Sequence, residues 1–228
     1  MPSLARRAIA ELYGTFALVF FGCGAVVMDS FPGAGGGLLS IALVHAIVLS
    51  VAVTATMYIS GAHFNPAVTL GLLSIRRIPA AEAFTYIASQ LAGALLAALA
   101  VKTLLPSSVG RLVAYGTPML NSSMTMTSAI VLEALLTFFL MSAVMGTAVS
   151  SRAARIGGFG IGLTLLFAIM IGGPLTGAAL NPARAFGPAA ISGVWAAQAV
   201  YWIGPIIGAV LAALLWHHVL LKEESAAE

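Results

Sequence analysis

Two stretches of this chain decide its fold: residues 60–69 read SGAHFNPAVT, and residues 176–185 read TGAALNPARA. Both contain Asn-Pro-Ala, at residues 65–67 and again at residues 181–183. An apolar run follows each tripeptide, Pro66–Ile75 in the first case and Pro182–Ser192 in the second. At 1.5 Å per helical residue, a run of about ten residues reaches about 15 Å, half the hydrocarbon thickness of a bilayer. Each run therefore predicts a short helix that enters a membrane and ends inside it.

The composition indicates an integral membrane protein. Of the 228 residues, 61% are hydrophobic and only 7% are charged, and residues 30–75 contain no Lys, Arg, Asp or Glu. So few charges cannot cover the exterior of a soluble domain. The net charge is only +3. The sequence has no basic patch with interleaved aromatic residues, so it does not predict nucleic-acid binding. Cys23 is the only cysteine, which excludes an internal disulfide and a cysteine-based metal cluster, so we expect no metal or cofactor.

Six further apolar runs are long enough to cross about 30 Å of hydrocarbon as helices. They cover residues 8–28, 39–59, 81–102, 126–149, 157–174 and 196–220. Lipid cannot satisfy open backbone groups, and these runs lack the in/out alternation of a transmembrane barrel. The sequence therefore predicts an all-α membrane protein with six transmembrane helices and two re-entrant half-helices.

The start of each half-helix carries its own signals. Asn is a favourable N-cap residue, and Pro at the first helical position lacks an amide proton that would be unpaired there anyway. The residues before Asn65 and Asn181 would form non-helical backbone at membrane depth, which is tolerated only where it lines a polar cavity. We therefore expect pore-lining backbone carbonyls from Gly61, Ala62, His63, Gly177, Ala178 and Ala179.

The two halves of the chain repeat each other beyond these motifs. Glu11 is followed by Thr15-Phe16 in the first span, and Glu133 is followed by Thr137-Phe138 in the fourth. Three spans per half is an odd number, so the second copy must be inverted in the membrane relative to the first. We expect one transmembrane domain over residues 1–228, built from inverted repeats at about 1–107 and 108–228.

The matching positions of Glu11 and Glu133 favour a symmetric structural role. We expect each buried carboxylate to accept hydrogen bonds from backbone amides of a re-entrant loop. The alternative is proton coupling in a transporter, which paired intramembrane acids can also indicate.

The distribution of basic residues predicts the orientation. Seven basic residues would lie on one side of the membrane, against Lys102 and Arg111 on the other, so both termini are expected in the cytoplasm. The seven are Arg6, Arg7, Arg76, Arg77, Arg152, Arg155 and Lys222. We expect a multi-pass protein of a bacterial or archaeal inner membrane.

The paired motifs, Asn65-Pro66-Ala67 and Asn181-Pro182-Ala183, on half-helices within six spans, resemble those of the aquaporin (major intrinsic protein) family over essentially the whole chain. The resemblance implies a homotetramer of independent pores without enzymatic activity. Each pore would pass water and other small uncharged solutes down their gradients.

Physical reasoning supports a pore that excludes protons. Each half-helix presents about half a positive charge at its N-terminus, and Asn65 and Asn181 carry side-chain amide donors there. A water molecule at the midplane would accept from both and could not relay a proton through a continuous chain. Passage would be fast because nothing binds tightly.

Arg184 is the only charged residue between Ile156 and Leu221, and an intramembrane charge indicates function. In the family pattern it belongs to a selectivity filter, and the resemblance places His45, Ile169 and Ala178 beside it. This set resembles the plant tonoplast subgroup, which is associated with water, ammonia and sometimes urea or glycerol. Glycerol-conducting relatives usually carry Asp directly after the filter arginine, and Ala185 stands there instead, which favours water.

Two other classes of protein remain open from the sequence. A secondary transporter can also use inverted repeats and broken helices, although neither half-helix carries the acid that coupling would require. An intramembrane enzyme would need a nucleophile with a base or a metal cluster, which His45 and His63 do not supply. We expect the His63 side chain to pack behind the pore, and Cys23 to pack in the core.

Overall fold

The structure, a computed structural model, describes residues 2–150, 153, 156 and 158–222. Arg152 and Arg155, which the orientation argument counts, lie outside these residues, and so does position 157 of the fifth predicted span.

Within the described residues, six helical segments are long and apolar enough to cross a membrane. They are α1 (Leu4–Asp29), α2 (Gly37–Ser60), α4 (Ala80–Leu104), α6 (Met126–Val144), α7 (Phe159–Thr176) and α9 (Gln198–Leu215). Short π-helical turns, η2 (Met145–Val149) and η3 (Trp216–Leu220), extend α6 and α9. The described residues contain no strand, so the predicted all-α fold class is confirmed.

The two predicted short helices are α3 (Pro66–Ser74) and α8 (Pro182–Ser192). Their nine and eleven residues correspond to about 14 and 17 Å at 1.5 Å per residue. The Asn65 side chain caps α3 by accepting from the amide of Ala67, and Asn181 caps α8 in the same way. Each short helix therefore begins at its Asn-Pro pair, as the sequence predicts.

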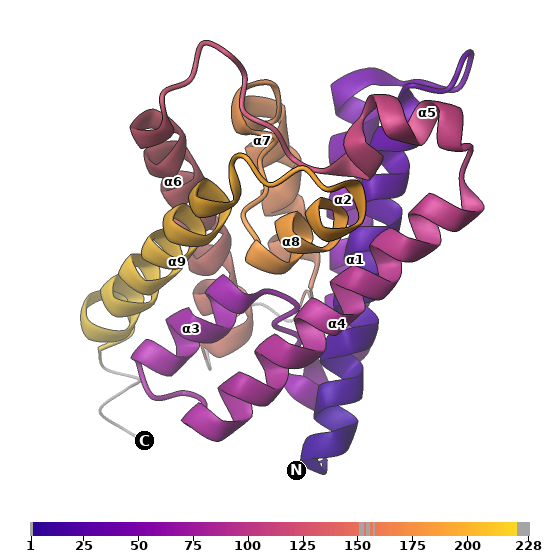
Figure 1. The fold of residues 1–228 in the computed structure, drawn as a ribbon. Coiled ribbons are helices and arrows are strands. Elements are labelled where there is room, and N and C mark those ends of the chain that lie inside the picture. The colour runs from indigo at the N-terminus through magenta and orange to yellow at the C-terminus, as the bar shows by residue number, and fades with distance from the viewer. Residues whose placement is uncertain (1, 151–152, 154–155, 157, 223–228) are drawn as a thin grey trace.

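The helices pack as two similar groups that exchange their short helices. In the first group α1 packs against α2 and α4, and in the second α6 packs against α7 and α9. Contacts between α2 and α7 join the groups, while α3 packs on α9 and α8 packs on α4. In Figure 1, α3 lies in the half of the molecule nearer the start of α1, and α8 lies in the other half.

Two glycines at matching positions let the long helices of each group approach closely. A Cβ built on Gly93 of α4 would lie 2.4 Å from the Leu12 carbonyl oxygen of α1. One built on Gly208 of α9 would lie 2.0 Å from the Ala134 carbonyl oxygen of α6. Neither crossing has room for a residue larger than glycine. Close approach through small residues is a common way for membrane helices to pack.

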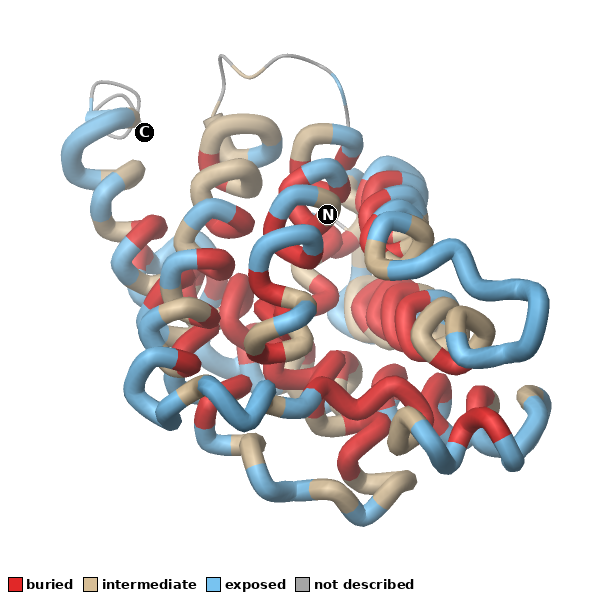
Figure 2. Tube along the Cα trace, turned by 90° about the horizontal axis from the view of Figure 1, so that it is seen from above, coloured by how far each residue is buried: buried red, intermediate tan, exposed pale blue. Residues whose placement is uncertain are grey.

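The outer surface of the helix bundle is apolar. Buried residues lie on the helix faces that point inward, and exposed residues lie on the outward faces (Figure 2). The outward residues include large hydrophobic side chains such as Val51, Phe84 and Ile171, which are 62%, 72% and 65% exposed. Such a surface suits lipid and would aggregate in water.

A longer connection between α4 and α6 covers one end of the bundle. It contains α5 (Ser107–Leu112) and the 3-10 turn η1 (Ala114–Gly116). Ala114 and Tyr115 have positive φ angles of 45° and 52°, a conformation that is costly for residues other than glycine. Contacts of η1 with α1 and α8 hold this turn against the interior.

Candidate functional site

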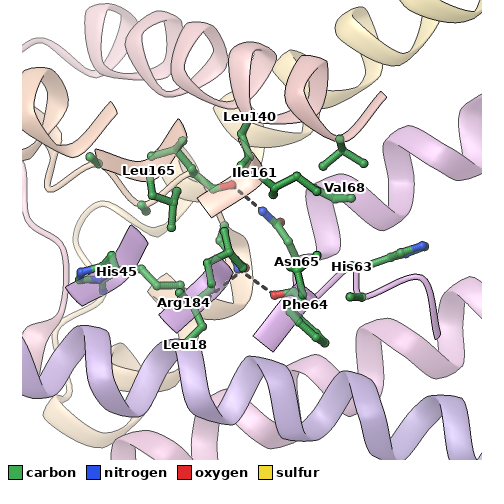
Figure 3. A pocket seen from close by; sticks show the side chains of 18 of the residues that line it. Leu18, His45, His63, Phe64, Asn65, Val68, Leu140, Ile161, Leu165 and Arg184 are labelled. Atoms are coloured by element: carbon green, nitrogen blue, oxygen red, sulfur yellow. Dashed lines mark hydrogen bonds between the residues drawn. The ribbon is translucent and has the colours of Figure 1, made fainter. Parts of the chain in front are cut away.

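The two motif asparagines meet at the centre of the molecule. The Asn65 side-chain amide donates to the Leu180 carbonyl oxygen at 2.8 Å, and the Asn181 amide donates to the Phe64 carbonyl oxygen at 2.9 Å. Each amide therefore binds the loop that precedes the other motif, as the dashed lines in Figure 3 show. Because an Asn amide nitrogen carries two hydrogens, one remains on each side chain for a solute.

The loops before both asparagines have the same unusual backbone. Gly61, Ala62 and Phe64 have φ angles of 85°, 53° and 52° in the first loop. At the matching positions of the second loop, Gly177, Ala178 and Leu180 have values of 79°, 43° and 52°. Two non-glycine residues in each loop are thus held in a left-handed conformation that costs roughly 1–3 kcal/mol per residue. The surrounding structure must hold this shape.

Buried carboxylates hold both loops. Glu11 accepts from the amides of His63 and Phe64 at 2.9 and 2.7 Å, and from the Ser60 hydroxyl at 2.7 Å. Its side chain is fully buried. These donors, together with the Gln90 amide at 2.8 Å, compensate much of the cost of removing a carboxylate from water.

Glu133 repeats this arrangement in the second half. It accepts from the amides of Ala179 and Leu180 at 2.9 and 2.8 Å, and from the Thr176 hydroxyl at 2.7 Å. These are the bonds that the repeated glutamates led us to expect from the sequence.

A tyrosine closes each loop from outside. The Tyr86 hydroxyl donates to the Ser60 carbonyl oxygen at 2.8 Å, and the Tyr201 hydroxyl donates to the Thr176 carbonyl oxygen at 2.7 Å. Sequence reasoning missed this pair, although the two tyrosines occupy matching places in α4 and α9.

A narrow cavity runs along both loops. It offers about 30 Å³ of space for the centres of water molecules, whereas one water needs roughly 10–15 Å³ by the same measure. Only a few waters therefore fit in it at one time. Its lining includes both asparagines and all four predicted filter residues, together with carbonyl-bearing loop residues and apolar side chains: Asn65, Asn181, His45, Ile169, Ala178, Arg184, Ala62, His63, Ala179, Leu18, Leu49, Val53 and Leu165.

Wider cavities adjoin the narrow one at both ends. The first vestibule, of about 310 Å³, shares His63 with the narrow cavity and is also lined by Gly61, Arg7 and Glu82. Arg7 and Glu82 form an ion pair there. The second vestibule, of about 220 Å³, shares His45, Ile169 and Arg184 with the narrow cavity and is also lined by Gly177. In Figure 3, His45 and His63 lie at opposite ends of the view with Asn65 between them.

Arg184 lies at the narrow cavity's junction with the second vestibule and is only 4% exposed. One of its terminal nitrogens, Nη1, donates to the Gly116 carbonyl oxygen at 2.8 Å and lies 3.9 Å from Cys23 Sγ. Its Nε is buried and has no hydrogen-bond partner among the described residues. A guanidinium carries five N–H donors, so the contact with Gly116 uses only part of its donor capacity. No local pattern in the sequence identifies Gly116 as the partner of Arg184.

The His45 ring has a fixed orientation at the same junction. Its Nδ1 lies 2.8 Å from the Ile41 carbonyl oxygen, and because a carbonyl only accepts, Nδ1 carries the hydrogen. In the neutral ring Nε2 is then an acceptor. His45 and Arg184 both line this junction.

The His63 side chain takes part in a polar cluster beside the first loop. Its Nδ1 lies 3.1 Å from the Thr69 hydroxyl oxygen, and its ring meets Tyr86 edge to face. Gln90 donates to Thr69 at 3.0 Å and to Glu11 at 2.8 Å. Sequence reasoning missed Thr69 and Gln90, because single polar residues in apolar helices carry no periodic signal.

Residues 1–216 match the family model described as Major intrinsic protein. The chain belongs to the major intrinsic protein family. It is 41% identical to Aquaporin TIP4-4 of Zea mays over 96% of this chain and 88% of that protein. It is 36% identical to Nodulin-26 of Glycine max, with 98% and 81% covered. Among solved structures, the aquaglyceroporin from Plasmodium falciparum matches with a TM-score of 0.81 and 25% identity, over 97% of this chain and 98% of that one.

Family membership settles the class of protein. The chain is an integral multi-pass membrane protein and a passive channel for water and small uncharged solutes, and membership implies a channel and not an enzyme. The resemblance found in the motifs is thereby confirmed. The relatives named here come from plants and from Plasmodium, so they give no support to the expected bacterial or archaeal membrane.

Proposed function

We propose that this chain conducts water in single file and rejects protons and ions. One observation supports this best: a narrow cavity lined by Asn65, Asn181 and Arg184 shares lining residues with a wider vestibule at each end. A file of water in such a passage exchanges bulk hydrogen bonds for loop carbonyls and amide donors at little net cost. Ammonia, glycerol and urea are candidate secondary solutes.

The asparagine pair opposes proton relay. α3 and α8 direct their N-terminal ends toward the pair, each with about half a positive charge. A water that accepts the free hydrogens of Asn65 and Asn181 holds its oxygen toward them and its own hydrogens outward, in opposite directions. The hydrogen-bond chain is then interrupted at that molecule. The Pro66, Ala67, Pro182 and Ala183 positions fix the helix starts that place these donors.

Arg184, His45, Ile169 and Ala178 form the selectivity filter in this proposal. A cation about 4 Å from the guanidinium meets a barrier of about 4 kcal/mol at an effective dielectric near 20, roughly a thousandfold in rate. The His45 ring lines the same junction as the arginine and limits its width. The four residues match the pattern of the tonoplast subgroup, and the similarity to Aquaporin TIP4-4 supports that placement.

The remaining features of the proposal follow the family. Four copies would assemble, each with its own pore, and both termini would lie in the cytoplasm. The matched loops, carboxylates and tyrosines support two inverted repeats, at about 1–107 and 108–228. The first vestibule would then open to the cytoplasm and the second to the opposite side.

Stopped-flow light scattering on proteoliposomes tests the proposal. With sucrose as osmolyte, vesicles that contain the protein should shrink faster than protein-free vesicles, with a lower activation energy. Identical shrinkage of both would refute water conduction. Uptake of ammonia, urea and glycerol, measured in turn, should rise in proportion to concentration. Saturation would instead favour the alternative of a secondary transporter.

A further inference from the structure

Gly22 and Cys23 are adjacent residues of α1. They lie directly behind the end of the narrow cavity that meets the second vestibule. Neither lines that cavity. Gly22 meets the ring of His45, and Cys23 meets the carbonyl group that binds Arg184. Both contacts are tight, so changes at either residue would reach the lumen through a second residue.

The contact at Gly22 leaves no room for a side chain. A Cβ built there would lie 2.4 Å from His45 Nε2 and 2.8 Å from His45 Cδ2, well inside van der Waals contact. His45 itself lines the narrow cavity, and its Nδ1 is tied to Ile41. A methyl group at position 22 must therefore push the His45 ring away from α1 and toward the lumen.

The contact at Cys23 acts through η1. The thiol Sγ lies 3.7 Å from the Gly116 carbonyl oxygen, within reach of a weak S–H hydrogen bond. A Cβ built on Gly116 would lie 2.7 Å from Cys23 Cβ, so the turn is seated against this residue. The same carbonyl accepts from Arg184 at 2.8 Å, and Cys23 Sγ lies 3.9 Å from the guanidinium. Cys23 is fully buried.

We propose that Gly22 and Cys23 are positioning residues that set the width and charge placement of the filter from behind. Gly22 has no side chain and so leaves room for the His45 ring. Cys23 packs against Gly116, whose carbonyl oxygen accepts from Arg184. The inference rests on the filter role proposed above for His45 and Arg184. It adds two selectivity determinants outside the pore lining.

Gly24 provides a matched control for Gly22 in the same helix. A Cβ there would meet only Leu105 Cδ1, at 3.8 Å, an ordinary contact. In proteoliposomes with equal amounts of full-length protein, Gly22→Ala should lower osmotic water permeability by about fivefold or more, and Gly24→Ala should change it by less than about twofold. The double variant Gly22→Ala/His45→Ala, which removes the displaced ring, should restore permeability.

The outcomes separate this inference from the proposed function. If wild-type vesicles conduct no water, the proposed function is wrong. If the wild type conducts and Gly22→Ala behaves like Gly24→Ala, only the inference is wrong. A double variant that stays as slow as Gly22→Ala also overturns it, because the loss would then come from misfolding of α1 and not from the ring.

Cys23 is tested through ion exclusion. Since a Coulomb barrier falls with distance, a loosened Arg184 in Cys23→Ala should raise the ratio of proton to water permeability by about threefold. Cys23→Ser keeps a donor toward the Gly116 carbonyl and should stay closer to the wild type. A ratio in Cys23→Ala equal to that of the wild type would remove Cys23 from the proposal. So would an equal rise in both variants, because the hydrogen bond would then not be what matters.

Discussion

The two re-entrant loops share one backbone but differ in the side chains behind it. Both have left-handed residues at matching positions and a fully buried glutamate that binds two loop amides. Behind the first loop, His63, Thr69 and Gln90 form a polar cluster. At the positions that match His63 and Thr69, the second loop has Ala179 and Ala185, both buried. A strained loop therefore requires the carboxylate, whereas the polar cluster is an addition to one half.

The lumen shows the opposite asymmetry. The residue after the first motif is Val68 and the residue after the second is Arg184, and both line the narrow cavity. The half with the simpler loop support thus carries the charge. The features that the two halves share set the shape of the loops. The position at which they differ, Val68 in one half and Arg184 in the other, sets the selectivity of the pore.

The largest effect is expected from Arg184→Val, which makes the second motif match the first at this position. Removing the charge should remove a barrier of about 4 kcal/mol to cations, so the permeability to protons and monovalent cations should rise by up to about a thousandfold. A pH-sensitive dye inside proteoliposomes and a cation flux assay measure it. Water permeability should not fall, because the side chain becomes smaller.

Val68→Ala is the matched control for that substitution. It enlarges the same cavity at the equivalent place in the first half but changes no charge, so cation exclusion should persist. Equal leaks in the two variants would show that pore width, and not the arginine, excludes cations.

The next largest effect should come from Glu11→Gln and Glu133→Gln. An amide group offers one acceptor oxygen where the carboxylate offers two, so one loop amide loses its partner at a cost of about 1–3 kcal/mol. Glu11 also accepts from Gln90 at 2.8 Å, so its variant should unfold at the lower temperature. Thermal unfolding in detergent measures both. If neither variant were destabilised, the carboxylates would not be holding the loops.

The parts of the fold that the sequence predicts are those with a local or repeated signal. The spans are long apolar runs, and the structure has them within a few residues of the predicted limits. Asn65-Pro66 and Asn181-Pro182 predicted where α3 and α8 begin, because cap and first-turn preferences are local. The repeated glutamates predicted a shared role because two copies of the motif fixed their register.

The parts that sequence reasoning missed depend on contacts between distant residues. Gly116 reaches Arg184 across 68 positions through a turn with positive φ angles at Ala114 and Tyr115, residues that do not favour that conformation. Gln90 and Thr69 meet only because α3 packs against α4. No local sequence pattern predicts the Gly116–Arg184 contact or the Gln90–Thr69 contact. The filter assignment itself came from resemblance, and it stays a prediction that the Arg184 experiment tests.

The smallest effect is expected from Thr69→Ala, which removes the centre of the polar cluster and makes the first half resemble the second. The Thr69 hydroxyl donates to the Asn65 carbonyl oxygen at 3.1 Å and receives Gln90 at 3.0 Å. Because its one hydrogen is used on Asn65, His63 Nδ1 must be the donor in their 3.1 Å contact. The substitution would leave that N–H unpaired and cost about 1–2 kcal/mol.

Thr164→Ala in α7 is the control, since the Thr164 hydroxyl bonds only the Gly160 carbonyl oxygen of its own helix among the contacts of the described residues. Thr69→Ala should lower the unfolding temperature more than Thr164→Ala does. Water permeability should change by less than about twofold, because Thr69 does not line the narrow cavity. A large loss of water flux with normal stability would mean that the cluster holds the lumen open, and that the first loop needs support that the second loop does without.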